Sequence, residues 1–115
     1  MPRNISFALT KEQFRDQSKT VTRRFGWKFL KAGDVLMAVE KGMGLKKGEK
    51  AVRMGMITVM DIRQQTLSAI TQEYCIREGL PELSADDFIQ FLMEHHKCKP
   101  DDIITRIEFR YGATS

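Results

Sequence analysis

A short basic segment carries the side chains of this sequence that are best suited to chemistry. Lys19 and Thr22 supply an amine and a hydroxyl three residues apart, and Arg23 and Arg24 follow directly. A hydroxyl becomes a nucleophile only when a base takes its proton. An amine is such a base once its pKa falls from about 10.4 toward neutrality, and burial and neighbouring cations both push a lysine that way. The segment therefore combines a candidate base, a candidate nucleophile and cations suited to an oxyanion or a phosphate.

The backbone must bring Lys19 and Thr22 to the same side for this chemistry. Thr20, Val21 and Thr22 favour a strand, and side chains three residues apart in a strand point to opposite faces. Lys19 must therefore lie in the turn before the strand, unless a bulge intervenes. Thr22 and Arg24 share a face without such help. The alternative interpretation of these residues is a solvated edge strand without a catalytic role.

Capping signals and one glycine predict three short helices. Thr10 begins a capping-box pattern, which predicts a helix over about 11–17. A second helix is predicted over about 70–78 and ends at Gly79. Ser84 is a typical N-cap for a third helix.

Extended segments rich in apolar residues predict strands over 19–24, 35–40, 52–62 and 103–111. The last of these alternates most cleanly, with an apolar face from Ile103 to Tyr111. Its polar face consists of Arg106, Glu108 and Arg110. The inventory of about five strands and three helices predicts an α+β fold in which strands dominate the core.

Length and charge limit the kind of protein further. A chain of 115 residues fits a single domain, 1–115, with room for one modest core. Residues 1–60 hold thirteen Lys or Arg against five Asp or Glu, whereas residues 61–115 hold six against ten. A basic half suits a polyanion or a phosphate-bearing ligand, although a solvated surface without a ligand has the same composition.

The sequence also indicates where the protein works. It has no long hydrophobic segment of the kind that a signal peptide or a membrane helix needs. Cys75 and Cys98 are too few for a disulfide framework and are expected to be reduced. We therefore expect a cytoplasmic protein without a membrane partner, with a monomer favoured.

Other segments have both a functional and a structural interpretation. Lys46 and Lys47 lie in a glycine-rich loop that suits an RNA backbone, or is simply the tip of a hairpin. Trp27 is suited to stack on a base, or to fill the core. His95 and His96 complete no recognised zinc spacing, so neither a metal nor another cofactor is expected.

The stretch Gln17-Ser18-Lys19-Thr20-Val21-Thr22-Arg23-Arg24 resembles the signature of the ASCH family, glycine-x-lysine-x-x-glutamate-x-arginine. Lys19 and Arg24 match the signature. Thr22 stands where many members have glutamate, and Gln17 stands where glycine is usual. The threonine at this position makes the sequence similar to one subgroup that also has threonine there, the small bacterial N4-acetylcytidine amidohydrolases. The resemblance implies a small β-barrel related to PUA-like RNA-binding domains, with about five strands and flanking short helices.

The same resemblance implies a catalytic set. In the subgroup, a lysine, a threonine three residues later and a downstream glutamate form the proposed set, and a similar segment here places Glu78 at the glutamate. The implied activity is deacetylation of N4-acetylcytidine or a related acylated nucleoside. Lys19 would be the base, Thr22 the nucleophile or the group that positions water, and Glu78 the polar partner. A carboxylate raises the pKa of a nearby lysine, so this assignment requires that Glu78 not lie too near Lys19 in the free enzyme.

Two rival functions use the same residues. In an RNA-binding module without activity, Lys19, Arg23 and Arg24 would contact phosphates with the loop lysines, and Trp27 would stack on a base. In an RNA-cleaving protein, Lys19 and Arg24 would act on a phosphate. A protein that binds no such ligand is also compatible with the sequence. The expected partner is therefore a nucleoside or an RNA ligand.

Overall fold

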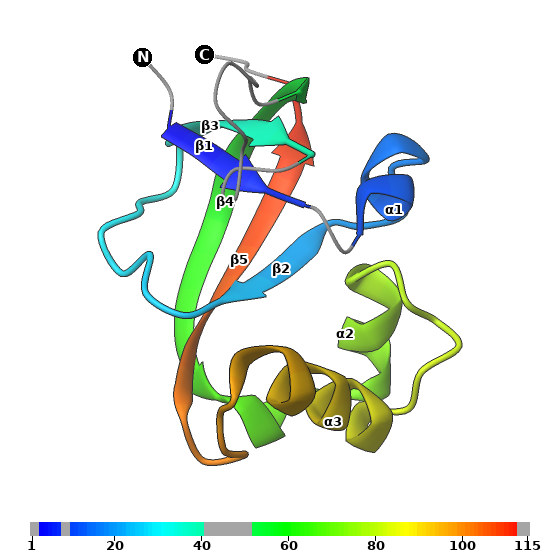
Figure 1. The fold of residues 1–115 in the computed structure, drawn as a ribbon. Coiled ribbons are helices and arrows are strands. Elements are labelled where there is room, and N and C mark those ends of the chain that lie inside the picture. Colours follow the sequence, from blue (N-terminus) through cyan, green and yellow to red (C-terminus); the bar gives the residue numbers. More distant parts are fainter. Residues whose placement is uncertain (1–2, 8–9, 41–51, 113–115) are drawn as a thin grey trace, which may run out of the picture.

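A five-stranded sheet in the order β1-β3-β4-β5-β2 forms the centre of the protein. The computed structural model describes residues 3–7, 10–40 and 52–112. The sheet curls into a half-barrel, and the long strands β4 and β5 run through its whole length (Figure 1). The strands are β1 (Arg3–Ser6), β2 (Val21–Arg24), β3 (Val35–Val39), β4 (Arg53–Thr66) and β5 (Ile103–Tyr111). The α+β prediction with about five strands is confirmed.

Strand β1 pairs parallel with β3, and all the other pairs are antiparallel. Residues 3–6 contain a single apolar side chain, Ile5, so hydrophobic periodicity did not predict β1. Strand β4 is longer than predicted because it continues to Thr66 beside β5. A register shift between Val59 and Asp61 leaves Met60 half exposed.

Arg106 lies on the face of β5 that was predicted to be polar, but the structure buries it. Arg106 is only 6% exposed, and Ile104 on the same face is fully buried. Helix α2 (Gln72–Arg77) covers this face of the sheet, where the Arg106 guanidinium lies over the ring of Tyr74. The alternation of apolar and polar residues identified the strand correctly, but it could not indicate that a helix covers the polar face as well.

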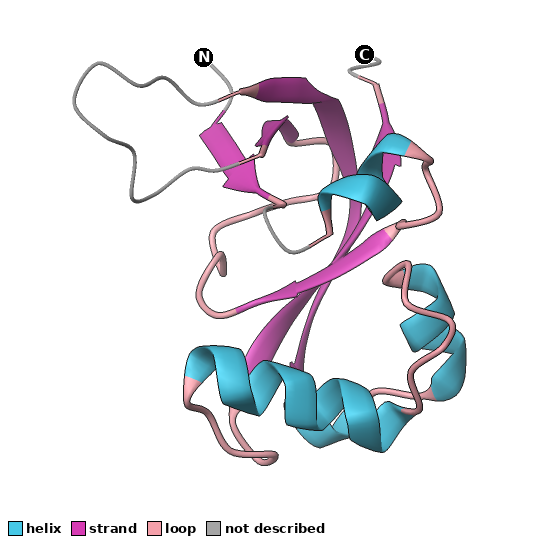
Figure 2. Ribbon diagram, turned by 45° about the vertical axis from the view of Figure 1, so that its right-hand side comes forward, coloured by secondary structure: helices cyan, strands magenta, loops and turns pink. Residues whose placement is uncertain are grey.

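The helices lie at one end and one side of the sheet (Figure 2). They are α1 (Lys11–Arg15), a 3-10 turn (Leu67–Ala69), α2 and α3 (Ala85–His96). The Ser84 hydroxyl accepts a hydrogen bond from the Asp87 N–H, which confirms the predicted N-cap. Thr10 makes no such bond, because its backbone is not in the extended conformation that aims an N-cap side chain at the helix.

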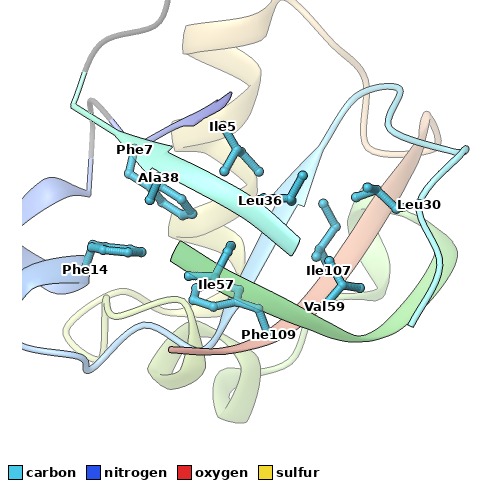
Figure 3. Close-up of a cluster of buried hydrophobic side chains, with 10 residues drawn as sticks. All are labelled: Ile5, Phe7, Phe14, Leu30, Leu36, Ala38, Ile57, Val59, Ile107 and Phe109. Carbon is cyan, nitrogen blue, oxygen red and sulfur yellow. The ribbon is translucent and has the colours of Figure 1, made fainter. Parts of the chain in front are cut away.

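Two hydrophobic clusters stabilise this arrangement. The first fills the inside of the half-barrel, where α1 contributes Phe14 to a group of ten buried side chains (Figure 3). The second lies between α2, α3 and the beginning of β5, and its buried members are Leu67, Ile70, Cys75, Phe88, Leu92 and Ile104. Three of the predicted site residues are buried as well, although their side chains are polar. They are Lys19, Thr22 and Glu78.

Gly79 ends α2 at a point where the backbone turns sharply and the chain is crowded. Its φ is +87°, and a Cβ added there would lie 2.6 Å from Gln13 Cβ and 3.3 Å from Lys19 Cβ. The predicted helix end at Gly79 is therefore correct, and the residue must also remain small.

Gly79→Ala is expected to lower the free energy of unfolding by about 3 kcal/mol, since strain at a positive φ adds to overpacking. Gly112→Ala is the matched control, because Gly112 has φ +96° but nothing within 4 Å of an added Cβ; there we expect about 1 kcal/mol. Urea denaturation of both variants measures the difference, and equal losses would contradict the proposed crowding at Gly79.

Candidate functional site

A cavity of about 390 Å³ lies at the β2 edge of the sheet. Its polar lining includes Lys19, Thr22, Arg23, Arg24 and Glu78. All predicted site residues within the described ranges line this cavity, and the remaining two, Lys46 and Lys47, fall outside those ranges. The other lining residues are Ser6, Phe7, Thr10, Phe25, Trp27, Leu80, Phe88, Phe91, Leu92 and His96.

Lys19 reaches the cavity because it precedes the strand. β2 begins at Val21, so the alternation of strand side chains does not force Lys19 and Thr22 onto opposite faces. The chain enters β2 through Gln17, whose φ is +62°. This left-handed conformation is one that glycine adopts without strain, which gives a physical reason for the glycine that is usual here in the ASCH signature.

The side chain of Glu78 joins two buried cations. Lys19 Nζ lies 2.9 Å from Glu78 Oε1 and also donates to the Glu78 backbone carbonyl at 3.0 Å. Arg23 Nη1 lies 3.4 Å from Glu78 Oε2. All three side chains are at most 4% exposed. The condition set above for a Lys19 base, that Glu78 not lie too near, is not met, because the end of α2 and the turn before β2 place the two side chains in contact.

Burial is the largest influence on the pKa of Lys19, and it outweighs the effect of Glu78. Removal of the amine from water lowers the pKa of Lys19, and the positive charges of Arg24 and Arg23 lower it further, whereas Glu78 acts in the opposite direction. The net direction is downward. The pKa of Lys19 is therefore lowered, which is the direction that a lysine base needs, although Glu78 remains its partner.

Thr22 and Arg24 form a second polar pair in the cavity. They share a face of β2, as predicted, and Arg24 Nε donates to Thr22 Oγ1 at 3.0 Å. Because this oxygen accepts from Arg24, its own O–H is left to point elsewhere. Burial lowers the pKa of Arg24 to about 10, which leaves the guanidinium charged at neutral pH. The Arg24 guanidinium also lies 4.9 Å from the centre of the Phe7 ring.

Aromatic and apolar side chains line the rest of the cavity. Trp27 packs against the first hydrophobic cluster and also lines the cavity, so the two interpretations of this residue are compatible. Phe25 is 38% exposed, and its ring lies 5.5 Å from that of His96. Sequence reasoning missed His96 as a lining residue. The signal was its spacing of four from Leu92 and eight from Phe88, which places the three on one side of α3.

Three arginines face one another across the sheet beside this site. Arg23 pairs with Arg106 in the β2–β5 register, and Arg106 pairs with Arg63 in the β4–β5 register. Opposed like charges destabilise a sheet, but the ring of Tyr74 lies 5.1 Å from the Arg23 guanidinium and 4.7 Å from that of Arg106. The carboxylate of Asp61 pairs with Arg63 and Arg106. Its Oδ2 lies 3.1 Å from Arg63 Nε and 3.5 Å from Arg106 Nη2.

Tyr111 holds the backbone of Lys19 in place, since its hydroxyl donates to the Lys19 carbonyl. Burial, with a smaller contribution from Asp16, raises the pKa of Tyr111 to about 12, so the hydroxyl keeps its proton at neutral pH. This bond connects the end of β5 to Lys19, two residues before β2 begins.

Tyr111→Phe is expected to lower the free energy of unfolding by about 1 kcal/mol, because it removes this one hydrogen bond and little packing. Urea denaturation near neutral pH provides the measurement. An unchanged midpoint would contradict a contribution of the Tyr111 hydroxyl to the position of Lys19.

Two negative findings bear on the kind of site. Within residues 3–7, 10–40 and 52–112, no group of three or more His, Cys, Asp or Glu side chains is placed to hold a metal ion. Among the helices that the structure describes, none is long and apolar enough to cross a membrane.

Comparison of structures defines the fold class. No protein-family model matches the chain, and no curated protein matches its sequence. Among solved structures, the chain is similar to an ASCH domain from Lactobacillus crispatus JV V101, with a TM-score of 0.61 and 9% identity over 95% of this chain and 79% of that one. The protein therefore has the ASCH fold, and the predicted resemblance is confirmed at that level.

A second solved structure agrees with this fold. It is a protein from Enterococcus faecalis V583 of the family DUF984, with a TM-score of 0.67 and 14% identity. The similarity covers 96% of this chain and 80% of that chain. At such low identities the two similarities define the fold and not the activity.

Proposed function

We propose that this protein is an amidohydrolase that removes the acetyl group from N4-acetylcytidine or a related acylated nucleoside. The observation that carries the proposal is the buried Lys19–Glu78 pair in a cavity that also contains the Thr22–Arg24 pair. Burial of an ion pair is costly unless its partners are fully satisfied. A lysine with a lowered pKa in a cavity is the kind of group that a hydrolase uses as a base.

The size and lining of the cavity support a nucleoside rather than a larger ligand. A volume of about 390 Å³ lies within the range of sites for small molecules. The wall from α3 presents Phe88, Phe91 and Leu92 to one side, which suits the flat apolar face of a base. Phe25 and Trp27 line the cavity as well and offer rings for stacking.

The proposed reaction assigns one step to each polar residue. The neutral amine of Lys19 takes the proton of the Thr22 hydroxyl, or of a water that this hydroxyl holds. The oxygen bonds to the acetyl carbon, and Arg24 stabilises the negative charge on the acetyl oxygen. The bond from the acetyl carbon to N4 then breaks while Lys19 returns the proton to N4. Cytidine leaves, and the acetyl group ends as acetate, after hydrolysis of the ester if Thr22 is the nucleophile.

In this proposal Glu78 holds Lys19 and does not attack the substrate. Its carboxylate and its backbone carbonyl both accept hydrogen bonds from Lys19 Nζ, which fixes the position of the amine. Arg23 Nη1 donates to the second carboxylate oxygen of Glu78. The negative charge of Glu78 is therefore shared between Lys19 and Arg23.

The test is the release of cytidine from N4-acetylcytidine by the purified protein, followed by chromatography. The expected result is many turnovers per protein molecule and a strong loss in Thr22→Val, which keeps the side-chain shape without the hydroxyl. Ser18→Ala is the matched control, since Ser18 is exposed beside the site, and it should act as the unchanged protein does. An intact fold without any release would refute the proposal.

RNA binding is the rival outcome of this test. It would follow if single-stranded RNA bound in a strongly salt-dependent manner and no nucleoside were consumed. The burial of Lys19 and Arg23 against Glu78 counts against this rival, because these two cations are not exposed for phosphate contacts.

A further inference from the structure

The free edge of β2 is the edge with which no strand pairs among the residues that the structure describes. β2 is the last strand of the sheet, so β5 pairs with only one of its two edges. The Phe109 N–H donates to the Thr20 carbonyl. Because hydrogen-bonded and non-hydrogen-bonded pairs alternate along an antiparallel ladder, Thr22 also directs its backbone groups toward β5. Val21 and Arg23 therefore direct theirs toward the free edge.

Only one of these two residues reaches the cavity with its main chain. Val21 has no exposed surface. Arg23 lines the cavity and is 6% exposed as a whole residue, although its side chain is only 1% exposed. Most of the accessible surface of Arg23 thus belongs to its backbone, while its guanidinium is buried between Glu78 and Tyr74.

The backbone of one strand residue offers a donor and an acceptor on the same edge. A planar ligand that presents an acceptor beside a donor is its complement. N4-acetylcytosine is such a ligand, because the N3 acceptor lies beside the N4–H donor. We infer that the Arg23 N–H and C=O recognise this N3/N4–H edge and so hold the acetylated N4 on the β2 side of the cavity, where Thr22 and Arg24 lie. The identity of the base rests on the function proposed above, whereas the recognition by backbone rests on the geometry of β2.

This inference predicts which changes of the ligand weaken binding. A site built to hydrogen-bond a ligand strongly rejects an analogue that leaves its buried polar groups unpaired. N4-acetyl-3-deazacytidine lacks the acceptor but keeps the shape of the base, and N4-acetyl-N4-methylcytidine lacks the donor. N4-acetyl-2′-deoxycytidine keeps both groups and is the matched control ligand.

The experiment is calorimetric titration of Thr22→Val, which binds without consuming the ligand, with these three analogues and N4-acetylcytidine. We expect at least tenfold weaker binding of the 3-deaza and N4-methyl compounds, and a change below threefold for the control ligand. Equal affinity for N4-acetylcytidine and its 3-deaza analogue would overturn the inference.

A second variant separates recognition by the backbone from recognition by the side chain. Arg23→Lys, made in the Thr22→Val protein, keeps the main chain and a cation for Glu78. The ratio of its affinities for N4-acetylcytidine and for the 3-deaza analogue should therefore stay within twofold of the ratio in Thr22→Val alone. A ratio near one would assign recognition to the guanidinium instead.

The two proposals fail in distinguishable ways. Suppose that the analogues bind with the expected differences in affinity but the unchanged protein releases no cytidine. That result would refute the amidohydrolase and support the recognition by the edge of β2. Release of cytidine without discrimination between the analogues would do the reverse. If none of the four ligands binds and the unchanged protein releases no cytidine, both proposals are refuted.

Discussion

Glu78→Gln is expected to lower the free energy of unfolding by about 3–5 kcal/mol, the cost of leaving buried charges without their counterion. Glu78 is the partner of both Lys19 and Arg23, and the three side chains are almost entirely removed from water. A neutral amide can still accept a hydrogen bond, but it offers no charge to either cation. Urea denaturation at neutral pH measures the loss.

Glu73→Gln is the matched control for this substitution. Glu73 lies on α2, the helix that Glu78 follows, and pairs with Arg77 at 3.4 Å, but its side chain is 71% exposed. Exposed pairs of this kind contribute about 0.5 kcal/mol or less, so this variant should unfold almost as the unchanged protein does. If both variants unfolded at the same urea concentration, Glu78 would not be the counterion that holds this region together.

Lys19→Arg is expected to reduce the rate of cytidine release by about a thousandfold, the order of magnitude that a positioned base contributes. The guanidinium keeps the positive charge for Glu78 but does not give up its proton at accessible pH. Stability should therefore change far less than catalysis. The measurement compares initial rates for Lys19→Arg and for Lys28→Arg, which changes an exposed lysine and should keep the full rate.

The pH profile gives an independent check of the same role. Catalysis by Lys19 requires the neutral amine, and burial lowers the pKa of this residue. The rate of the unchanged protein should therefore rise with pH through that lowered pKa and then level off. Full activity of Lys19→Arg, or a rate that falls as pH rises over the same range, would exclude Lys19 as the base.

Local signals predicted much of the fold because each depends on neighbouring residues. The strand β5, the Ser84 cap and the Gly79 helix end were visible in the sequence and are present in the structure. Burial of Arg106 was not predictable, since it depends on the placement of α2 far along the chain. The same limit explains why sequence periodicity did not identify β1, whose neighbour in the sheet is distant in sequence.

The candidate site was predictable in part for a similar reason. The residue types and spacing of Lys19, Thr22 and Arg24 pointed to the polar side of the cavity, and the resemblance to ASCH proteins added Glu78. The direct contact of Glu78 with Lys19 and the position of His96 on α3 depend on how three separate segments pack. No pattern within one segment carries that information.

The cavity touches both hydrophobic clusters of the protein. Phe7 belongs to the cluster inside the half-barrel, Phe88 and Leu92 belong to the cluster beneath the helices, and all three line the cavity. A molecule that fills this space contacts both clusters at once and binds only when they are assembled. Binding and resistance to heat are then linked: at a hundred times its dissociation constant, such a ligand would add about 2.7 kcal/mol to the free energy of unfolding. The empty protein is accordingly the form most easily unfolded, and in a cell it would persist longest where its ligand is abundant.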